Sequence, residues 1–561
     1  MNGRLSHHPN LLKSDYDAVI VGSGYGGGVA AARLARCGMR VCLLERGREI
    51  AVGEFPSRPS QMVGDLQVES DAGHIGHHSA LFDVRLGSDV DVLLGCGLGG
   101  TSLINANVCL EPDPRTFEDR RWPEPIRTDG VFAEGLQRAR AMLRPQPYSG
   151  QPTLRKLENL TASAIALGAT SSFPPLHVAF AEGFNAAGVR QAACTLCGDC
   201  CAGCNVGAKT TVALTYLPLA ARHGAEIFSG VLVRSLQKRS DGRWQIDAVV
   251  RQPGPRGKSA RINAAIVVLA AGTLGSTEIL LRSRAQGLAV SELVGEHLTS
   301  NGDVIAISYN NRDPVNSIGT GYPPKLQTDP VGPAVAGLID LRAAGDLDRG
   351  LVVVDASIPS TLAPLLPGWL ALAGSAAAGA QAELAISDQV DALGRAVSSL
   401  IEGAYQGPVG RTQTYLAVSH DSGRGRLVLD RDRLKIDWPG AALQEVFQRI
   451  DATLGRMTEA TGGTYIARAL APIRRGKVLT VHPLGGCAMG EDRSSGVVNH
   501  KGQVFDASSA SSSQIHPGLY VCDGAVVPRS LGVHPLLTIT ALAERAMIHL
   551  IRDRYSPTQQ G

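Results

Sequence analysis

Two histidines near the C-terminal end of the chain lie in glycine-rich segments, and each is followed by proline. His482 opens the segment His-Pro-Leu-Gly-Gly, and His534 lies in Gly-Val-His-Pro. A histidine at such a junction is most often a structural hydrogen-bonding group. A neutral imidazole, with an unperturbed pKa of about 6.5, can also accept a proton near neutral pH. The two residues are therefore candidates for a general base and a neighbouring hydrogen-bonding group.

Five of the eleven cysteines fall in one short segment, and four of them have the spacing C-x2-C-x2-C-x3-C. This is the spacing of a bacterial ferredoxin run, although Asn205 replaces the usual proline. Four soft thiolates so close together favour an iron–sulfur cluster over tetrahedral zinc, whose ligand pairs are usually separated by a longer loop. Zinc and a metal-free arrangement remain alternatives, with Cys201 as the spare thiol. The candidate metal ligands are Cys194, Cys197, Cys200 and Cys204.

A strand–helix–strand unit is predicted near the N-terminus. A β-branched run at 17–21 is followed by a glycine-rich turn, an Ala- and Leu-rich helix at 29–37 and a strand at 40–44. The first glycine suits a tight turn, the second the close approach of a pyrophosphate, and the third close helix–strand packing. An acid after the second strand can accept hydrogen bonds from a ribose diol. These residues are Gly22, Gly24, Gly27 and Glu45. The pattern predicts dinucleotide binding without distinguishing FAD from NAD.

A second glycine-rich block, at 95–107, combines four glycines with hydroxyl and amide side chains. Such a loop can press its backbone N–H groups against a flavin and offer side-chain donors to its polar edge. The candidate cofactor-binding residues of this block are Gly99, Gly100, Ser102 and Asn105.

Two later segments are expected to return to the first sheet. A buried-type strand at 265–270 precedes a helix that starts near 276, and another strand at 518–522 ends in an acid. A carboxylate at the carboxyl edge of such a strand is well placed for a polyhydroxyl chain, such as the ribityl of FAD. The candidate residues are Ala271, Gly272, Asp523 and Gly524.

The expected fold is α/β, with a discontinuous cofactor domain. We expect 14–301 and 474–561 to form a Rossmann-type FAD-binding domain, the first part including the cysteine-rich segment 194–204. An inserted α+β substrate domain is expected at 302–473.

In their order along the chain, these blocks resemble the glucose–methanol–choline (GMC) oxidoreductases, most closely the bacterial cholesterol oxidase branch. The shared blocks lie at 22–28, 95–107, 270–276, 482–486 and 532–535, and the resemblance spans 17–550. It implies an FAD-dependent alcohol dehydrogenase or oxidase. It also implies that His482 takes the alcohol proton, and that His534 hydrogen-bonds the developing alkoxide and orients the carbinol hydride toward flavin N5.

The chemistry agrees with that assignment, because an alkoxide is a much better hydride donor than an alcohol. The sterol-oxidising branch usually has Asn at the second position, so His534 leaves the substrate class open. A steroid-like or other bulky apolar alcohol is expected. The alternatives are a sugar or polyol dehydrogenase that passes electrons through an iron–sulfur cluster, and a flavin/iron–sulfur electron carrier without alcohol chemistry.

Some relatives in the sterol branch carry a similar cysteine-rich segment before Gly-Ala-Lys, found here at 207–209. Certain sugar dehydrogenases of the family use a cysteine cluster to pass electrons onward. An external electron acceptor is therefore at least as well supported as oxygen.

Composition and charge narrow the remaining function classes. The chain has 561 residues and a formal net charge of +3 with mixed charges, which argues against a nucleic-acid binder. Residues 1–13 contain no apolar signal-like run, which indicates a cytoplasmic protein. The uncharged stretch 356–382 is interrupted by prolines and predicts a buried helix rather than a transmembrane segment. An apolar wall or lid over the substrate is the alternative. The oligomeric state is not predicted.

Overall fold

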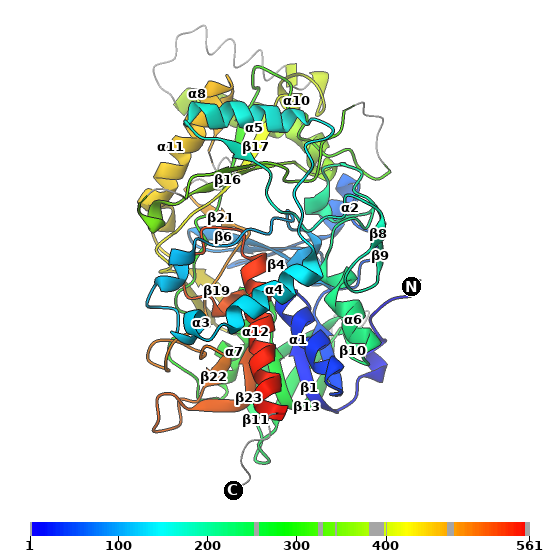
Figure 1. The fold of residues 1–561 in the computed structure, drawn as a ribbon, viewed down its shortest axis with the longest axis vertical. Coiled ribbons are helices and arrows are strands. Elements are labelled where there is room, and N and C mark those ends of the chain that lie inside the picture. The colour runs from blue at the N-terminus through cyan, green and yellow to red at the C-terminus, as the bar shows by residue number, and fades with distance from the viewer. Residues whose placement is uncertain are drawn as a thin grey trace.

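The computed structural model describes residues 3–251, 257–323, 329–342, 345–380, 398–399, 401–467 and 476–555. Figure 1 shows an elongated molecule, with the sheet of β1 and β13 in the lower half and a second sheet, beside α5, α8 and α11, in the upper half. The helices named below are α1 (Tyr25–Arg36), α4 (Val131–Leu143), α5 (Arg155–Ala166), α6 (Tyr216–Arg222), α7 (Gly272–Ala285), α8 (Leu366–Ala380), α11 (Glu445–Ala460) and α12 (Leu536–Tyr555). Four short helices are α2 (Pro59–Gly64), α3 (Pro125–Thr128), α10 (Gly407–Gly410) and the 3₁₀ turn Gly100–Leu103.

The first sheet is built on five parallel strands in the order β10, β2, β1, β13 and β23. Their bounds are β10 (Glu226–Ser229), β2 (Val41–Glu45), β1 (Asp15–Val21), β13 (Lys258–Leu269) and β23 (Ile515–Val521). Antiparallel neighbours extend it: β12 (Trp244–Val250), β11 (Val231–Lys238) and β22 (Gln503–Phe505). The predicted Rossmann-type core and its two returning strands are therefore present.

Helix α1 begins at Tyr25, earlier than the sequence pattern predicts. The glycine run forms its first turn, because side chains there would collide with the sheet. A Cβ on Gly26 would lie 1.5 Å from the Cys522 carbonyl oxygen, and one on Gly27 would lie 2.0 Å from that of Gly22. Close packing outweighs the low helix propensity of glycine, about 1 kcal/mol per residue relative to alanine.

Strand β13 is also longer than predicted, and α7 begins at Gly272 rather than near 276. The first half of β13 pairs antiparallel with β12, and only its second half joins the parallel core beside β23. The sequence pattern indicated only the second half, because that half alone is buried on both faces.

The second sheet is antiparallel, in the order β20, β14, β17, β16, β15 and β7. Its strands are β20 (Thr464–Ile466), β14 (Val304–Tyr309), β17 (Gln413–Val418), β16 (Val352–Ala356), β15 (Leu338–Asp340) and β7 (Ser171–Ser172). Helices α5 and α11 pack together beside it, around the buried Tyr415, Phe447 and Leu454. Because α5 and β7 precede residue 302, this sheet also takes in part of the segment expected in the cofactor domain.

A third sheet has the order β21, β6, β5, β3 and β4. Its strands are β21 (Val478–Thr480), β6 (Val90–Gly95), β5 (Phe82–Leu86), β3 (Leu66–Ser70) and β4 (Gly73–Ile75). Strands β21 and β6 are parallel neighbours. Parallel strands end at the same edge of a sheet, so the 95–107 block and the His482 loop emerge side by side.

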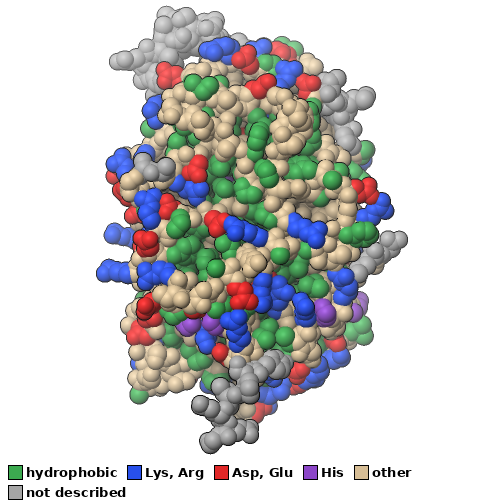
Figure 2. Space-filling view, in the orientation of Figure 1, with side chains coloured by type: hydrophobic (Ala, Val, Ile, Leu, Met, Phe, Trp, Pro, Cys, Tyr) green, Lys and Arg blue, Asp and Glu red, His purple; other side chains and the backbone are tan. Residues whose placement is uncertain are grey.

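The uncharged stretch 356–382 forms the end of β16, a 3₁₀ segment and α8, and its last two residues lie outside the described residues. Leu370 is fully buried, whereas Leu372 is 75% exposed, so α8 is half-buried rather than wholly buried as predicted. Within the described residues, no helix combines the length and apolar character needed to cross a membrane. Basic and acidic side chains are interspersed over the face shown in Figure 2.

Candidate active site

His482 follows β21 and is held by a buried carboxylate. Its Nδ1 lies 2.8 Å from Oδ1 of Asp303, whose side chain is fully buried. The other oxygen of Asp303 accepts hydrogen bonds from Thr480 Oγ1 (2.8 Å), the Val481 N–H (2.9 Å) and the His482 N–H (3.0 Å). A carboxylate can only accept, so Nδ1 carries the proton and Nε2 of a neutral ring is left with a free lone pair.

His534 lies just before α12 and faces His482. The two ring centroids are 5.1 Å apart, with the rings at 81° to each other. Among the described residues, neither nitrogen of His534 has a hydrogen-bond partner, although both are buried. Burial and the neighbouring His482 hold the pKa of His534 well below its usual value. The ring is therefore neutral, with one N–H to donate and one lone pair to accept.

The segment carrying His534 is fixed by two side chains from the second half of the chain. Asn301 Oδ1 accepts from the Leu531 N–H (2.8 Å) and Gly532 N–H (3.2 Å), and its Nδ2 donates to the Val533 carbonyl (2.8 Å). The His420 ring packs so closely that a Cβ on Gly532 would lie 2.3 Å from its Nε2. The position of His534 thus depends on contacts from 301 and 420.

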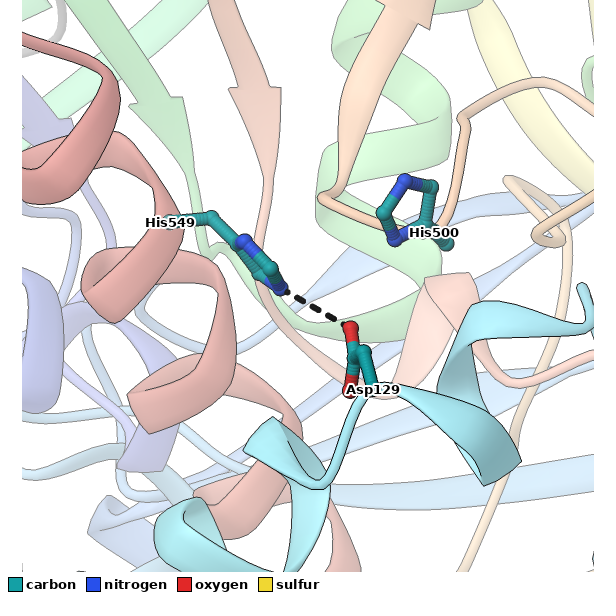
Figure 3. Close-up of side chains that lie close together, drawn as sticks. All are labelled: Asp129, His500 and His549. Carbon is teal, nitrogen blue, oxygen red and sulfur yellow. Dashed lines mark ion pairs between the residues drawn. The ribbon is translucent and has the colours of Figure 1, made fainter.

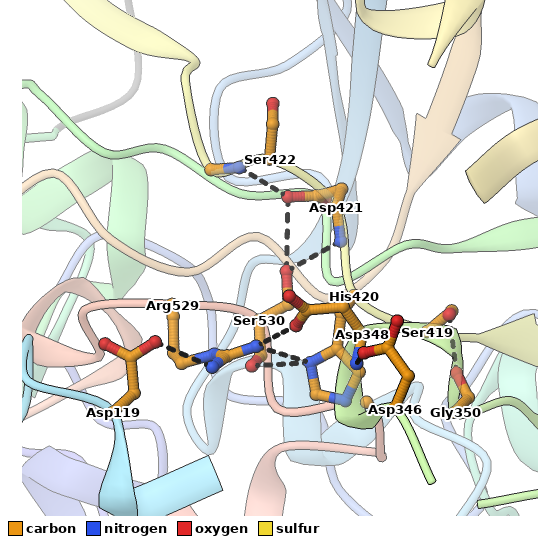
Figure 4. Close-up of polar contacts among 12 residues, drawn as sticks. Asp119, Asp346, Asp348, Gly350, Ser419, His420, Asp421, Ser422, Arg529 and Ser530 are labelled. Atoms are coloured by element: carbon orange, nitrogen blue, oxygen red, sulfur yellow. Dashed lines mark hydrogen bonds and ion pairs between the residues drawn. The ribbon is translucent and has the colours of Figure 1, made fainter. Parts of the chain in front are cut away.

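Figure 4 shows the polar network behind this segment. The buried Arg529 donates to Asp119 (2.8 Å) and to Asp348 (2.5 Å), and one of its nitrogens lies 3.4 Å from His420 Nδ1. Burial, assisted by the positive charge of Arg529, lowers the pKa of His420 to about 4. Ser530 Oγ adds a contact with Thr299 Oγ1 (2.6 Å). Through Arg529 and Ser530, the segment that carries His534 is therefore hydrogen-bonded to residues far from it in the sequence, at 119, 299 and 348.

The candidate residues at the N-terminal turn meet at the carboxyl ends of β1 and β2. Glu45 is buried and accepts from the Ser23 N–H (3.1 Å), Ser23 Oγ (2.6 Å) and the Gly47 N–H (2.7 Å). Gly22 has φ +95°, as its turn requires. A Cβ on Gly24 would have no atom within 4 Å. There is therefore open space in front of the first turn of α1.

The 95–107 block packs on this turn. A Cβ on Gly100 would lie 2.9 Å from the Gly24 Cα, and the Gly99 N–H donates to Ser23 Oγ (2.9 Å). Ser102 is buried and satisfied within the fold, because Oγ donates to the Gly99 carbonyl (2.6 Å) and accepts from the Val212 N–H (3.1 Å). Asn105 Nδ2 donates to the Tyr25 hydroxyl (2.7 Å), while its buried Oδ1 has no partner among the described residues.

The two returning segments meet at the same sheet edge. Asp523 Oδ2 accepts from the Gly272 N–H (2.9 Å) and Ser276 Oγ (2.5 Å), and Ser276 Oγ also accepts from the Ala271 N–H (3.0 Å). Burial raises the pKa of Asp523 to about 6. Gly524 lies against α7, since a Cβ there would be 2.8 Å from Thr273 Oγ1.

The histidine loop lies directly on these residues. The Gly485 N–H donates to the Gly524 carbonyl (3.0 Å), the Cys487 N–H donates to the Ala525 carbonyl (3.0 Å), and Thr273 Oγ1 donates to the Pro483 carbonyl (2.7 Å). The structure therefore joins the candidate catalytic and cofactor-binding residues into one region.

The four candidate cysteine ligands line a single cavity of about 420 Å³, together with Lys209. They do not form a group of three ligand atoms within 4.8 Å of one another; in the described residues, such a group is made by Asp129, His500 and His549 (Figure 3). Arg545 forms an ion pair with Asp129 and lies 2.9 Å from His500 Nδ1, so a cation already sits among those atoms. A metal bound by the cysteines remains a prediction.

Sequence reasoning missed the residues that hold the two histidines. Asp303 lies 179 residues before His482. Asn301 and Asp303 flank a glycine, but this short polar run has no motif spacing that marks it.

Comparisons with known proteins match one family along most of the chain. The two parts of the GMC oxidoreductase family model match residues 16–301 and 431–543. Cholesterol oxidase from Mycobacterium tuberculosis is 27% identical and the one from Acinetobacter baumannii is 24% identical. The alignments cover 95% and 96% of this chain, and 91% and 94% of those proteins.

More distant matches agree with the same assignment. Long-chain-alcohol oxidase FAO4B from Arabidopsis thaliana is 24% identical, over 95% of this chain and 67% of that protein. The crystal structure of pyridoxine 4-oxidase from Mesorbium loti superposes with a TM-score of 0.56 at 17% identity, covering 97% of this chain and 100% of that one. At this identity, the structural match supports the fold assignment alone.

Proposed function

Because the chain belongs to the GMC oxidoreductase family and is an oxidoreductase, we propose that it binds FAD and oxidises an alcohol CH–OH group to a carbonyl. The observation that carries the proposal is the pairing of His482 with His534, 5.1 Å apart, beside the shared sheet edge. One ring has a fixed lone pair for a proton, and the other is neutral and has a free donor.

The residues at that edge fit FAD. The open space at Gly24 and the Oδ1 of Asn105, which has no partner in the described part of the chain, indicate where a ligand's polar groups would be accommodated. We assign the turn of Gly22, Gly24 and Gly27 to the pyrophosphate, and Glu45 to the ribose. Asp523, with Ala271, Gly272 and Gly524 around it, is assigned to the ribityl chain, and Gly99, Gly100 and Asn105 to the ring system. Ser102 stabilises the 95–107 block through its hydrogen bonds to Gly99 and Val212. When bound, FAD supplies the hydride acceptor.

His482 acts as the general base in this proposal. Its Nε2 takes the hydroxyl proton, and Nδ1–H continues to donate to Asp303. The charge that develops on the ring is then stabilised by a carboxylate that is already hydrogen-bonded and needs no rearrangement. Removal of the proton makes the carbinol a much better hydride donor.

His534 positions the alcohol oxygen. A neutral imidazole can donate its N–H to the alkoxide as negative charge develops, and its low pKa keeps it from becoming a competing cation. His534 is 3% exposed, so water has little access to the hydrogen bond.

We propose a steroid-like or other bulky apolar alcohol as substrate, which the names of the cholesterol oxidase and long-chain-alcohol oxidase relatives support. A sugar or polyol dehydrogenase is the alternative. The test is an anaerobic screen of sterols, long-chain alcohols and polyols that follows bleaching of the flavin. Bleaching by an apolar alcohol supports the proposal, bleaching by polyols alone supports the alternative, and no bleaching by any alcohol contradicts alcohol oxidation.

The reduced enzyme is proposed to pass electrons to oxygen or to an external acceptor. Repeating the screen with oxygen and with an artificial one-electron acceptor separates the two routes. A cluster on the four cysteines belongs to the second route. An electron carrier without alcohol chemistry is the least supported reading, because a carrier needs no base beside a neutral donor.

A further inference from the structure

The amide of Asn105, in the block assigned to the flavin ring, has one atom with a partner and one without. Its Nδ2 donates to the Tyr25 hydroxyl (2.7 Å), whereas the buried Oδ1 has no partner in the ranges that the structure describes. A buried acceptor without a donor is destabilising, and in native structures such a group usually finds a partner. A donor from a ligand is therefore expected at Oδ1.

His177 lies behind Tyr25, and the position of its proton follows from its contacts. Its Nδ1 lies 3.0 Å from the Thr210 carbonyl oxygen, and its Nε2 lies 3.4 Å from the Tyr25 hydroxyl. A carbonyl oxygen can only accept, so Nδ1 carries the proton and Nε2 is an acceptor. The ring is neutral, because burial, assisted by the charge of Lys209, lowers the pKa of His177 to about 3.

The Tyr25 hydroxyl passes this arrangement on to Asn105. Burial raises the pKa of Tyr25 well above its usual value, so the hydroxyl keeps its proton and donates it to His177 Nε2. Its oxygen must then accept from Asn105, which turns the amide nitrogen toward Tyr25 and the amide oxygen away from it. The reverse direction would set the lone pairs of His177 Nδ1 and the Thr210 carbonyl against each other. The three side chains therefore have a single direction of hydrogen bonding.

This row of side chains borders the open space assigned to FAD. Tyr25 is the first residue of α1, directly after Gly24, where a Cβ would have no atom within 4 Å. The block that carries Asn105 packs on the same turn, because a Cβ on Gly100 would lie 2.9 Å from the Gly24 Cα. The unpartnered amide oxygen and the space in front of α1 are thus parts of one region.

We propose that Tyr25 and His177 are positioning residues, which present Asn105 Oδ1 as a fixed acceptor for the N3–H group of the flavin ring. N3–H is the one donor on the ring of an oxidised flavin, since N1, N5 and the carbonyl oxygens of the ring accept. The inference rests on the proposed function, because it requires bound FAD.

Backbone contacts hold the positioning residues in place. The His177 N–H donates to the Asn107 carbonyl (3.0 Å), and the His177 carbonyl accepts from the Thr210 N–H (2.9 Å). Lys209 Nζ donates to the Asn105 carbonyl (2.6 Å). His177 is fully buried and Tyr25 is 9% exposed, so water has little access to the hydrogen bonds between them. The amide is therefore oriented before a ligand binds, which lowers the entropic cost of binding.

The assignment is tested with 3-methyl-FAD, in which a methyl group replaces the N3 proton. Flavin is released from full-length protein, and the dissociation constants of FAD and 3-methyl-FAD are measured on the apoprotein by flavin fluorescence. Wild type should bind the analogue about tenfold more weakly than FAD. Asn105→Ala should bind the two within about twofold of each other, because the acceptor that faces N3 is gone. Melting temperature checks that the variants fold.

Tyr25→Phe tests the positioning role, because it keeps the Asn105 amide and removes the hydroxyl that orients it. FAD should bind about tenfold more weakly than to wild type, and discrimination against 3-methyl-FAD should fall. Tyr216→Phe is the matched control. Tyr216 is also buried and packs against α1, but its hydroxyl donates to Glu544 (2.9 Å). This variant should keep the wild-type ratio of the two dissociation constants, whatever its melting temperature.

Equal binding of FAD and 3-methyl-FAD by wild type, or an unchanged ratio in Asn105→Ala, would refute acceptance from N3–H. An unchanged ratio in Tyr25→Phe would refute the positioning role. In the apoprotein, ¹⁵N chemical shifts should place the proton of His177 on Nδ1, and a proton on Nε2 would refute the direction of hydrogen bonding. Failure of wild type to bind FAD at all would refute the proposed function and this ligand with it, while the His177 shifts would still decide the direction.

Discussion

The imidazole of His482 and the carboxylate of Asp303 meet at 2.8 Å, although they are separated by 179 residues. The remaining oxygen of Asp303 is saturated by three donors from 480–482. The carboxylate therefore has one orientation, and it dictates which nitrogen of His482 is protonated.

Replacing Asp303 by Asn should move the proton of His482 from Nδ1 to Nε2. The amide oxygen must face the three donors, which turns the amide NH₂ toward Nδ1 and forces the proton onto Nε2. We expect flavin reduction by the alcohol to slow about 10²- to 10⁴-fold, with FAD retained. Stopped-flow absorbance measures the rate, and ¹⁵N chemical shifts of His482 report its tautomer.

Thr480→Val is the matched control for Asp303→Asn. It removes one donor to Asp303 without changing the group that faces His482, so its effect on the rate should be much smaller. An Asp303→Asn enzyme that reduces its flavin as fast as wild type would show that the tautomer of His482 does not matter.

His482→Ala should slow flavin reduction by about 10²- to 10⁴-fold, or roughly 3 to 5 kcal/mol, because the proton acceptor is lost. FAD content should change little, since the side chain faces Asp303 and His534. Anaerobic rapid mixing measures the rate, and the exposed His223 gives a control variant, His223→Ala. Equal rates in wild type and His482→Ala would place the base elsewhere.

At His534, the loss in the rate of flavin reduction should depend on which residue replaces the histidine. Asn can still donate to the alkoxide oxygen, so His534→Asn should be milder than His534→Ala, which loses the donor and leaves a cavity. The ratio of the two flavin-reduction rates at saturating alcohol is the measurement. Indistinguishable rates would mean that His534 does not contact the reacting oxygen.

Glu45→Gln and Glu45→Arg should both weaken FAD retention, the second more strongly. Glutamine keeps one acceptor for the Ser23 and Gly47 donors, whereas arginine offers only donors next to them. Flavin released on gel filtration, compared with wild type, quantifies the loss. Full occupancy in Glu45→Arg would contradict the assignment of this carboxylate to the cofactor.

Acid should destabilise the protein because two buried histidines resist protonation in the folded state. Burial lowers the pKa of His177 to about 3 and that of His420 to about 4, whereas an unfolded histidine titrates near 6.5. Between about pH 6.5 and 4 these two histidines bind more protons in the unfolded chain than in the folded one, so their contribution makes the free energy of unfolding fall as pH falls. A shift like that of His420 corresponds to at most about 3 kcal/mol.

The measurement is the melting temperature between pH 7.5 and 4.5. His420→Gln removes one of the titrating groups, so its melting temperature should fall less steeply over this range than that of wild type. Parallel curves would mean that His420 is protonated in the folded protein.

The sequence alone determined the parts of this protein whose chemistry is local. The glycines at 22–27 indicate a tight turn and a close approach of the backbone to a ligand, and the acid at 45 marks the end of a strand. Each of these features depends on only a few neighbouring residues. The apolar runs before Ala271 and Asp523 likewise marked two returning strands. For this reason the Rossmann-type core could be predicted and both histidines could be named as candidates, whereas the start of α1 at Tyr25, the length of β13 and the start of α7 at Gly272 differed from the prediction.

The tertiary structure decided which distant residues meet. The pairing of β21 with β6 brings His482 beside the 95–107 block, and the turn after residue 300 brings Asp303 behind the ring. The local sequence pattern at 301–303 does not predict these contacts, because the register between strands far apart in the sequence is set by packing of the whole core. The cysteine spacing was visible in the sequence, but the cavity and Lys209 beside it exist only in the fold.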